Sequence, residues 1–233
     1  MPIDPAALEA RLLASWEDNA AAWTDAVRNQ RIPSRRAGTD AAILAACARY
    51  DARNVLDVGC GEGWLSRALA VPTRRVFGID GSADLIAHAS ATESSAQFKV
   101  LGYEALATDA GVVAGPWDLI ICNFALLGEP LVPLMRALSQ RLAPAGSLLV
   151  QTVHPWMAMG DGRYTNEWRE ENFQGFGVAF PASMPWYYRT LGSWLSQLGE
   201  AGLVIRTLEE PVHADTGRPL SMLLHCSHAA PTR

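Results

Sequence analysis

The chain has 233 residues, which suits one α/β domain with additional N-terminal helices. Its hydrophobic content of 49% supports a sizeable core, yet it contains no apolar run of about 18 residues that would predict a membrane span. The net charge of −5, without an extended Lys/Arg cluster, argues against a nucleic-acid-binding surface.

The N-terminus and the cysteines indicate a cytoplasmic protein. The first residues, MPIDP, lack the basic-then-apolar pattern of a signal peptide. The four cysteines show no metal-type pairing, so we expect reduced thiols and no metal site; they stand at positions 47, 60, 122 and 226.

In chain order, the first elements are helices. Apolar residues spaced for one helix face predict a helix over 5–29, which residues 32–35 break. Thr39 or Asp40 can cap a second helix that runs to about Tyr50. Residues 1–50 are therefore expected to form a helical N-terminal cap.

Strands and helices then alternate, which implies a mostly parallel sheet with helices on both faces. We expect strands at 54–58, 75–79, 97–101, 117–122, 147–152, 203–208 and 220–226. We expect helices at 62–70, 83–90, 104–110, 131–142 and 190–200.

The turn after the first predicted strand is the strongest functional signal. An apolar run ends in Asp57, and glycines follow at 59, 61 and 63 before a helix-forming segment. This geometry brings bare backbone N–H groups and a helix N-terminus against a ligand. The second strand ends in Asp80, where a carboxylate can accept hydrogen bonds from both hydroxyls of a ribose. Together these features predict a nucleotide-type cofactor.

The glycine spacing narrows the cofactor. A dinucleotide fingerprint requires a third glycine where Trp64 stands, and no Gly-Lys-Ser/Thr follows to form a P-loop. Asp57 and Glu62 would also repel a pyrophosphate. The loop therefore suits a ligand whose near end is cationic.

Five ordered motifs resemble those of class I S-adenosylmethionine-dependent methyltransferases, over roughly residues 52–226. They are DVGCGEG at 57–63, GIDGS at 78–82, WDLIICNFAL at 117–126, LSQRLAPAGSLLV at 138–150, and LGEAGLV at 198–204 followed by Glu210 and Pro211. The resemblance implies a seven-stranded sheet of order 3-2-1-4-5-7-6 with strand 7 antiparallel. It also implies S-adenosylmethionine as cofactor and S-adenosylhomocysteine as product.

The resemblance assigns cofactor roles to residues around the glycine loop. Gly59 and Gly61 would pass under the methionine portion, and Asp57 would accept from its ammonium group, directly or through water. Asp57 can equally cap the loop, which is compatible with that role. Asp80 would bind the ribose hydroxyls, although it can also cap a helix. The residues expected to border the adenine are Gly81, Ser82 and Leu85.

Further cofactor contacts are expected from three other segments. After the third strand the family often has an acid, but here Tyr103 and Glu104 follow Gly102. Tyr103 would pack on the adenine and the Glu104 N–H would bind it, whereas a side-chain contact to the adenine amino group is in doubt. Asn123 and Phe124 would touch the methionine portion and the reactive face. Upstream, Trp23 and Arg35 are further candidates; Arg35 would bind the cofactor carboxylate, or be an ordinary exposed arginine.

Residues 154–188 lack periodicity but hold nine of the nineteen aromatic residues. We expect this aromatic segment to form a lid over the carboxyl ends of strands 4 and 5, with Trp156, Trp186 and Tyr188 contacting a methyl acceptor. The alternative is an insertion that packs on the N-terminal helices.

His154 is the candidate catalytic base. It follows the fifth strand at the carboxyl edge of the sheet, and an ordinary histidine titrates near neutral pH. A base is needed only where the acceptor must lose a proton. The alternative is a structural histidine that binds the backbone of the aromatic segment.

These observations favour a methyltransferase acting on an O or N atom of a small, apolar or aromatic acceptor. The alternatives are a protein-directed methyltransferase and a non-catalytic module that binds S-adenosylmethionine or S-adenosylhomocysteine. We expect one methyltransferase domain over 1–233, working as a monomer or homodimer. Its parts would be the cap at 1–50, the cofactor-binding core at 52–153, the aromatic segment at 154–188, and a C-terminal helix and strands at 189–228.

Overall fold

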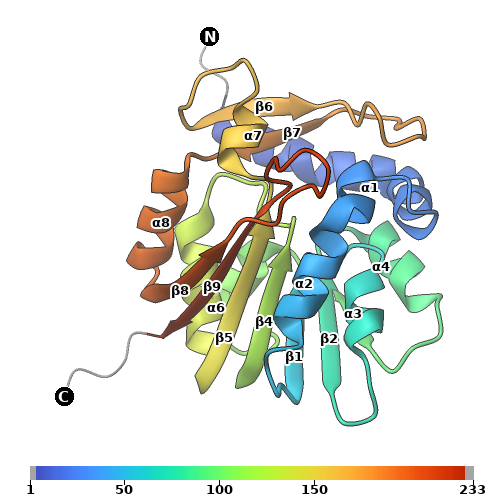
Figure 1. The fold of residues 1–233 in the computed structure, drawn as a ribbon. Helices are drawn as coiled ribbons and strands as arrows, with labels where there is room; N and C mark the ends of the chain where they lie inside the picture. The colour runs from blue at the N-terminus through green and yellow to red at the C-terminus, as the bar shows by residue number, and fades with distance from the viewer. Residues whose placement is uncertain (1–3, 229–233) are drawn as a thin grey trace.

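The computed structural model describes residues 4–228. A seven-stranded sheet forms its centre, with strand order β3-β2-β1-β4-β5-β9-β8 (Figure 1). The strands are β1 (Asn54–Val58), β2 (Arg75–Asp80), β3 (Gln97–Val100), β4 (Trp117–Asn123), β5 (Leu142–Thr152), β8 (Leu203–Glu209) and β9 (Met222–His228). The first five are parallel, while β9 runs antiparallel to β5 and β8. The predicted sheet order and its antiparallel strand are confirmed.

Helices cover both faces of the sheet, as the alternation predicted. On one face lie α2 (Asp40–Cys47) and α3 (Trp64–Leu69), and on the other α5 (Tyr103–Thr108), α6 (Leu131–Arg141) and α8 (Leu191–Glu200) (Figure 1). Successive residues of a strand point to opposite faces. Val55 therefore packs with α2 and α3, whereas Leu56 and Val58 pack with α5 and α6. Asp57 consequently points toward α3.

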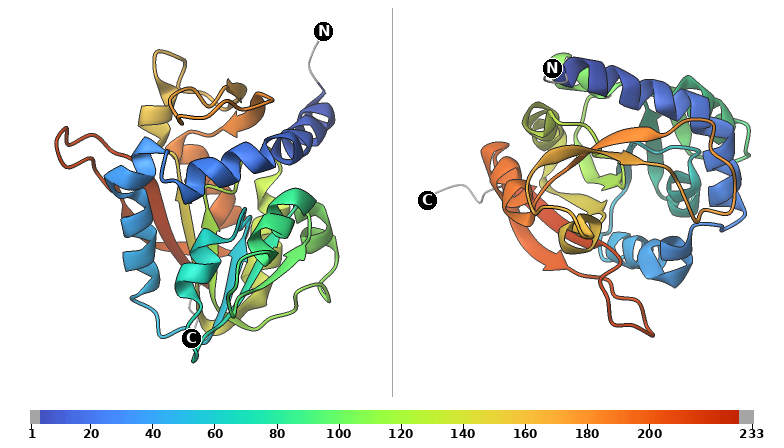
Figure 2. Two further views of the ribbon diagram at one scale, coloured as in Figure 1. Left: turned by 90° about the vertical axis from the view of Figure 1, so that its right-hand side faces the viewer. Right: turned by 90° about the horizontal axis from the view of Figure 1, so that it is seen from above.

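The N-terminal helix α1 (Pro5–Arg28) lies across the carboxyl ends of the strands (Figures 1 and 2). It begins at Asp4, whose carboxylate accepts from the Ala6 N–H, with Pro5 in the first turn where its missing N–H costs nothing. It also packs against α4 (Ala83–Ser90), the helix after β2. Ser82 caps α4 by accepting from the Leu85 N–H at 3.1 Å.

Of two sequence expectations near the N-terminus, one is confirmed and one is wrong. The first helix, predicted over 5–29, is found at Pro5–Arg28, where Asn29 caps it and Gln30 has a positive φ of 52°. The side chains of Thr39 and Asp40 do not cap the second helix. A π-helical turn, η1 (Arg35–Thr39), leads directly into α2 instead, with Gly38 at a φ of 152°.

The aromatic segment contains regular structure that its sequence did not predict. It comprises α7 (Pro155–Met159) and an antiparallel hairpin of β6 (Glu167–Glu171) and β7 (Met184–Tyr188), separate from the main sheet. Figure 1 shows the hairpin above the carboxyl ends of β4 and β5, and Figure 2 shows it from above, running alongside α1. Tyr187 N–H donates to the Leu127 carbonyl at 2.7 Å, which joins β7 to the loop after β4. The segment thus contacts both the strand ends and the N-terminal helix.

Candidate functional site

The turn after β1 is built around backbone conformations that favour glycine. Gly59, Gly61 and Gly63 have φ values of 71°, 57° and 83°. The Gly59 and Cys60 N–H groups donate to the Ile79 carbonyl at 2.8 and 3.0 Å, which ties the turn to the end of β2. A side chain at Gly59 would collide with Ala125, because a Cβ there would lie 2.4 Å from the Ala125 Cβ. The loops after β1, β2 and β4 therefore meet at one place.

Asp80 lies at this junction. Its carboxylate accepts from the Gly61 N–H at 2.8 Å and from the Ser82 N–H at 2.9 Å. The residue remains partly exposed, and each oxygen has a further lone pair. Desolvation raises the pKa of this carboxyl, partly offset by the backbone hydrogen bonds from Ser82 and Gly61. Asp80 thus connects the glycine loop to α4 and can still accept hydrogen bonds from a ligand.

Asp57 is buried beneath the loop. It is 1% exposed and accepts from the Ser66 hydroxyl of α3 at 2.7 Å. Burial raises the pKa of Asp57 to about 6. The hydrogen bond from the Ser66 side chain opposes this rise in pKa, and the nearby charge of Asp80 adds to it. Asp57 thus joins β1 to α3, while the loop N–H groups of Gly59 and Gly61 bind Ile79 and Asp80.

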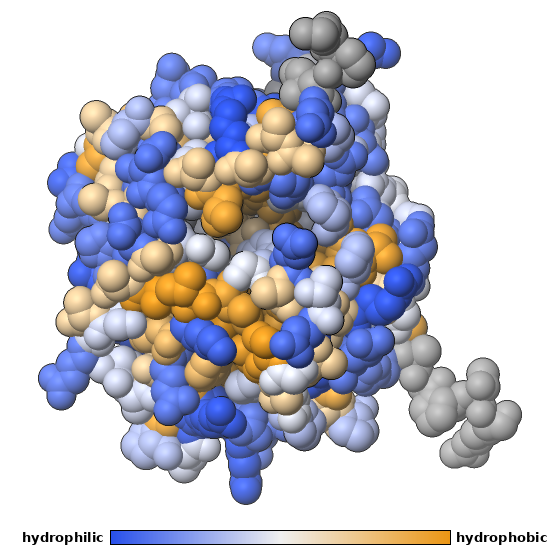
Figure 3. All heavy atoms as spheres, turned by 180° about the vertical axis from the view of Figure 1, so that it is seen from behind, coloured by the Kyte–Doolittle hydropathy of each residue, from blue (hydrophilic) through white to orange (hydrophobic). Residues whose placement is uncertain are grey.

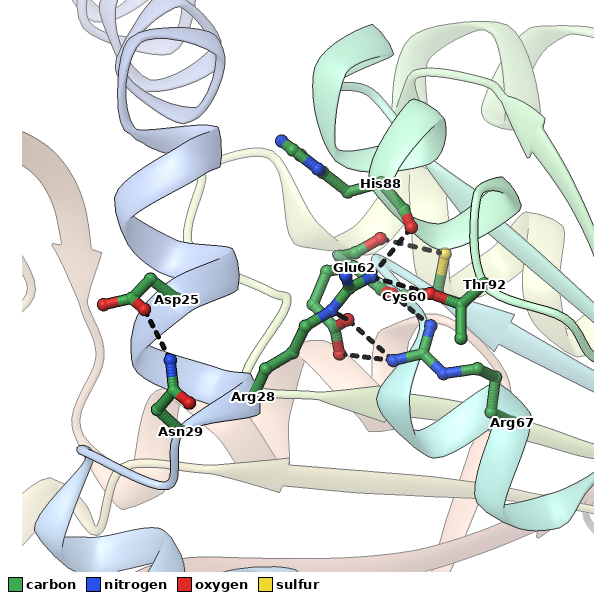
Figure 4. A network of polar contacts seen from close by, with 9 residues as sticks. Asp25, Arg28, Asn29, Cys60, Glu62, Arg67, His88 and Thr92 are labelled. Atoms are coloured by element: carbon green, nitrogen blue, oxygen red, sulfur yellow. Dashed lines mark hydrogen bonds and ion pairs between the residues drawn. The ribbon is translucent and has the colours of Figure 1, made fainter.

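Glu62 anchors the loop to α1 and α3 (Figure 4). Its carboxylate is fully buried and pairs with Arg67 at 2.6 Å and with Arg28 of α1 at 2.8 Å. Arg28 also donates to the His88 carbonyl at 2.8 Å and to the Thr92 hydroxyl at 3.0 Å. The sequence suggested only that Glu62 makes the loop acidic; the Arg28 contact spans 34 positions and left no sequence signal.

Trp23 and Arg35 approach the loop from the N-terminal segment. The indole Nε1 of Trp23 would lie 3.5 Å from a Cβ at Gly61. Arg35 Nε instead pairs with Asp40 at 2.8 Å, and its guanidinium stacks 4.4 Å from the centroid of the Trp64 ring. Asp40 thus holds Arg35 beside the loop. The Arg35 side chain is 12% exposed, so it is not the ordinary exposed arginine of the alternative interpretation.

The start of α4 is covered by α1. Glu17 accepts from the Ser82 hydroxyl at 2.9 Å and from the Ala83 N–H at 2.7 Å. Leu13 of α1 lies against Gly81, because a Cβ at Gly81 would be 3.0 Å from the Leu13 Cδ1 atom. The neighbouring Ser82 is buried. The remaining adenine candidate, Leu85, is a buried residue of α4 and is 2% exposed.

Tyr103 occupies the space above the glycine loop. Its hydroxyl donates to the Ala125 carbonyl at 3.0 Å and would lie 2.5 Å from a Cβ at Gly59. Burial raises the pKa of this phenol well above its usual range. Next to it, Glu104 is exposed in the first turn of α5, and a Cβ at Gly102 would meet no atom within 4 Å.

The end of β4 shows local backbone strain. Phe124 has a φ of 53°, a left-handed conformation that is costly for a bulky residue and recurs at functional sites. Its N–H donates to the Gln151 carbonyl at 2.7 Å, and the Gln151 amide donates to the Asn123 side chain at 3.1 Å. Asn123 and Phe124 are thereby fixed at the edge that also holds Gly59 and Asp80.

The three acceptor candidates differ in exposure. Trp156 is 63% exposed on α7, and Trp186 is partly buried against the aromatic cluster beneath the hairpin. Tyr188 is 1% exposed, and its hydroxyl donates to the Pro155 carbonyl at 2.8 Å. Tyr188 thus joins β7 to α7 in this conformation. Trp186 and Tyr188, but not Trp156, line a small hollow formed by residues 126, 127, 152, 153, 155, 186–189 and 194.

His154 follows β5 and pairs with Glu210, with 2.7 Å between Nε2 and the carboxylate. Its side chain makes no cap bond to α7, although it occupies the N-cap position. Within residues 4–228, no three His, Cys, Asp or Glu side chains group as metal ligands would. In the same part of the chain, no helix combines the length and apolarity needed to cross a bilayer.

Two buried residues of the site region were missed from the sequence. Arg189 is 2% exposed and donates to the carbonyls of Leu126 and Glu129 at 3.3 and 3.0 Å, which fixes the loop after β4. Asn19 is fully buried in α1 and binds both backbone groups of Ala182, at 2.8 and 3.0 Å. No sequence signal pointed to either residue, because each binds backbone groups far away along the chain, and any residue type can supply such groups.

Comparison with known proteins finds relatives for part of this chain. Residues 55–146 match the family described as methyltransferase domain. The "Ubiquinone biosynthesis O-methyltransferase" of Xanthomonas campestris pv. campestris (strain B100) is 34% identical over 117 residues, 48% of this chain and 47% of that protein. That of Xanthomonas oryzae pv. oryzae (strain PXO99A) is 34% identical over 105 residues, 43% of each chain. The chain spans about half the length of the curated relatives that it matches.

Solved structures share the fold over more of the chain. The Burkholderia thailandensis 1,6-didemethyltoxoflavin-N1-methyltransferase, solved with 1,6-didemethyltoxoflavin and S-adenosylhomocysteine, has a TM-score of 0.67 at 16% identity, covering 99% of this chain and 93% of that one. An S-adenosylmethionine-dependent methyltransferase from Mesorhizobium loti has a TM-score of 0.56 at 22% identity, covering 74% and 89%. Residues 55–146 thus match a methyltransferase domain, and the chain shares the fold of these solved S-adenosylmethionine-dependent methyltransferases, as its motifs predicted.

Proposed function

We propose that the chain transfers a methyl group from S-adenosylmethionine to an oxygen or nitrogen atom of a small, apolar or aromatic acceptor, leaving S-adenosylhomocysteine. The observation that carries this proposal is the junction of Asp80 with the glycine loop. A partly exposed carboxylate at the end of β2, bonded to Gly61 and Ser82, is suited to a ribose diol.

The residues around Asp80 fit the adenosine end of this cofactor. Gly81 and Gly102 border the region without side chains of their own, and the space beside Gly102 is open. The methionine end would lie over Gly59, where the Tyr103 hydroxyl stands. Tyr103 therefore has to leave its bond to the Ala125 carbonyl when the cofactor enters. Figure 3 views the molecule from behind, relative to Figure 1. It shows a hollow near the middle of this face, with apolar surface above and below it.

When bound, S-adenosylmethionine supplies a methyl group already activated by a cationic sulfur. The chain then has to hold the acceptor in line and exclude water. The hairpin, α1 and the loop after β4 are in position to do so, because all three meet over the carboxyl ends of β4 and β5. His154 is the candidate base for an acceptor that must lose a proton.

The acceptor class rests on two kinds of support. The curated relatives are named for O-methylation in ubiquinone biosynthesis, and the Burkholderia neighbour is named for N-methylation of a small heterocycle. The aromatic cluster under the hairpin, which includes Trp16, Trp23 and Phe173, offers apolar surface near the glycine loop. Buried reduced cysteines agree with a cytoplasmic location.

Isothermal titration with S-adenosylhomocysteine, S-adenosylmethionine and NAD tests the cofactor assignment. We expect binding of the first two only, and a loss of about 10- to 100-fold in affinity for Asp80→Asn, since hydrogen bonds to a charged group are removed. Asp84→Asn is the matched control, an exposed acid four residues on. No binding of either sulfur compound by the wild type would overturn the proposal.

The titration, combined with an assay for methyl transfer, also distinguishes the proposed enzyme from a non-catalytic module and from a protein-directed methyltransferase. A non-catalytic module would bind both forms of the cofactor yet release no S-adenosylhomocysteine with any acceptor. A protein-directed enzyme would methylate polypeptides but not phenols, catechols or aromatic amines.

A further inference from the structure

The pairing of His154 with Glu210 has a consequence for how a proton would leave the acceptor. His154 is 12% exposed and Glu210 is 53% exposed, so the pair leads from the protein interior to solvent. The contact joins Nε2 to a carboxylate oxygen at 2.7 Å. Glu210 comes from the connection between β8 and β9, 56 positions along the chain.

The contact determines which ring nitrogen carries the hydrogen. A carboxylate only accepts hydrogen bonds, so a bare Nε2 at 2.7 Å would place two lone pairs against each other. Nε2 must therefore be the N–H donor. In a neutral imidazole this leaves Nδ1 without a hydrogen and with its lone pair free.

Nδ1 has the property expected of a poised acceptor. It is buried and has no hydrogen-bond partner among the described residues. A buried polar atom without a partner is costly, so its retention calls for a reason. A purely structural role for His154 does not explain the unpartnered Nδ1, because the ring binds neither the N-terminus of α7 nor the backbone of the hairpin.

We propose that Glu210 is a positioning residue that holds His154 in the Nε2–H tautomer, so that Nδ1 takes the proton of the acceptor hydroxyl or amine. This inference rests on the proposed function and extends it. The acceptor oxygen or nitrogen loses its proton to Nδ1 as its electron pair forms the bond to the methyl carbon. The imidazolium that results is stabilised by the Glu210 carboxylate and returns its proton to solvent.

Three variants separate orientation from charge. Glu210→Gln keeps an oxygen that accepts from Nε2–H but removes the negative charge, whereas Glu210→Ala removes both. Asp215→Ala is the matched control; Asp215 belongs to the same connection, is 89% exposed and lies near His213 rather than His154.

The first measurement is nitrogen-15 NMR of histidine-labelled protein at pH 8.5, with the His154 signals assigned by their loss in His154→Gln. We expect the Nε2–H tautomer in the wild type, in Glu210→Gln and in Asp215→Ala, and a mixture of tautomers in Glu210→Ala. An Nδ1–H tautomer in the wild type, or no change in Glu210→Ala, would overturn the proposal.

The second measurement compares S-adenosylhomocysteine affinity with turnover of the phenol, catechol or aromatic amine that the wild type methylates best. We expect Glu210→Ala to lower kcat by about 100-fold and Glu210→Gln by less, with the dissociation constant of S-adenosylhomocysteine changed less than about twofold. Equal kcat in all variants would remove the positioning role while leaving the methyltransferase intact. Failure of the wild type to bind S-adenosylhomocysteine would instead remove the proposed function, and the proton transfer with it.

Discussion

At the scale of single residues, the site combines buried charge with close backbone approach. Asp57, Glu62 and Asp80 lie within one turn and the strand next to it, yet each carboxylate has a different environment. Asp57 is partnered by Ser66, Glu62 by two arginines, and Asp80 by two backbone N–H groups. These partners decide how each acid responds to pH and to substitution.

Asp57 should make the free energy of unfolding fall as pH rises. Its folded pKa of about 6 exceeds the usual 3.8, so between these values the folded state binds more protons than the unfolded state. The penalty builds up over this window and is complete above pH 6, at on the order of 3 kcal/mol. Asp57→Asn, which can still accept from Ser66, should stabilise the ligand-free protein at pH 7.5 but not at pH 4. Urea unfolding at both values measures this; an equal gain at both would contradict it.

Gly59 should tolerate alanine far less well than Gly61. Both have positive φ, which costs an L-residue about 1–2 kcal/mol. At Gly59 the added methyl also meets the Ala125 Cβ at 2.4 Å, while at Gly61 the nearest atom is 3.5 Å away. Gly59→Ala should therefore lower the midpoint of urea unfolding well beyond Gly61→Ala. Matching losses would mean that the loops after β1 and β4 are not in contact.

At the scale of elements, two arginines hold the glycine loop in different ways. Arg67 of α3 is 17% exposed and Arg28 of α1 is 39% exposed, and both pair with the buried Glu62. Removing a partner from a buried carboxylate typically costs about 3–5 kcal/mol, and less where solvent can replace it. Arg67→Ala should thus destabilise more than Arg28→Ala.

Hydrogen exchange distinguishes the two variants further. Arg28→Ala should speed exchange in α1 without affecting β1 and β4, whereas Arg67→Ala should affect α3 and the loop. Unchanged α1 exchange in Arg28→Ala would show that this ion pair does not hold the helix.

The main sheet was predictable because its strands are apolar, its helices are amphipathic and its motifs stand in order. The hairpin of β6 and β7 was not, because Glu167, Arg169 and Glu170 give β6 a charged pattern and Pro185 interrupts β7. The glycine loop and Asp80 could be located from spacing alone. The contacts of Glu17, Asn19 and Arg189 could not, since each depends on a backbone group brought close only by the fold.

At the scale of the whole molecule, α1 connects the regions that a ligand would touch. It contacts the loop after β4 through Glu9, α4 through Glu17, the hairpin through Asn19 and the glycine loop through Arg28. A change at the glycine loop therefore has a physical route to the hairpin through α1, in addition to the one through the loop after β4.

Asn19→Ala should uncouple the hairpin from the rest of the site. It leaves the N–H and carbonyl of Ala182 without their partner, at a cost of about 1–3 kcal/mol. We expect faster hydrogen exchange in β6 and β7 and a reduced kcat, with S-adenosylhomocysteine affinity within about twofold of wild type. Ser15→Ala is the control, because this buried hydroxyl binds only the Leu12 carbonyl of its own helix. Identical exchange in both variants would contradict the coupling.

The four cysteines have a practical consequence for following these motions. All are free and buried, and burial raises the thiol pKa of Cys47 and Cys226 to about 12 and that of Cys60 and Cys122 above its usual range. Since the thiolate is the reactive form, the native protein should resist maleimide dyes. A cysteine substituted for the exposed Trp156 would then be the one reactive site, and a fluorophore attached there would report movement of α7 when a ligand binds.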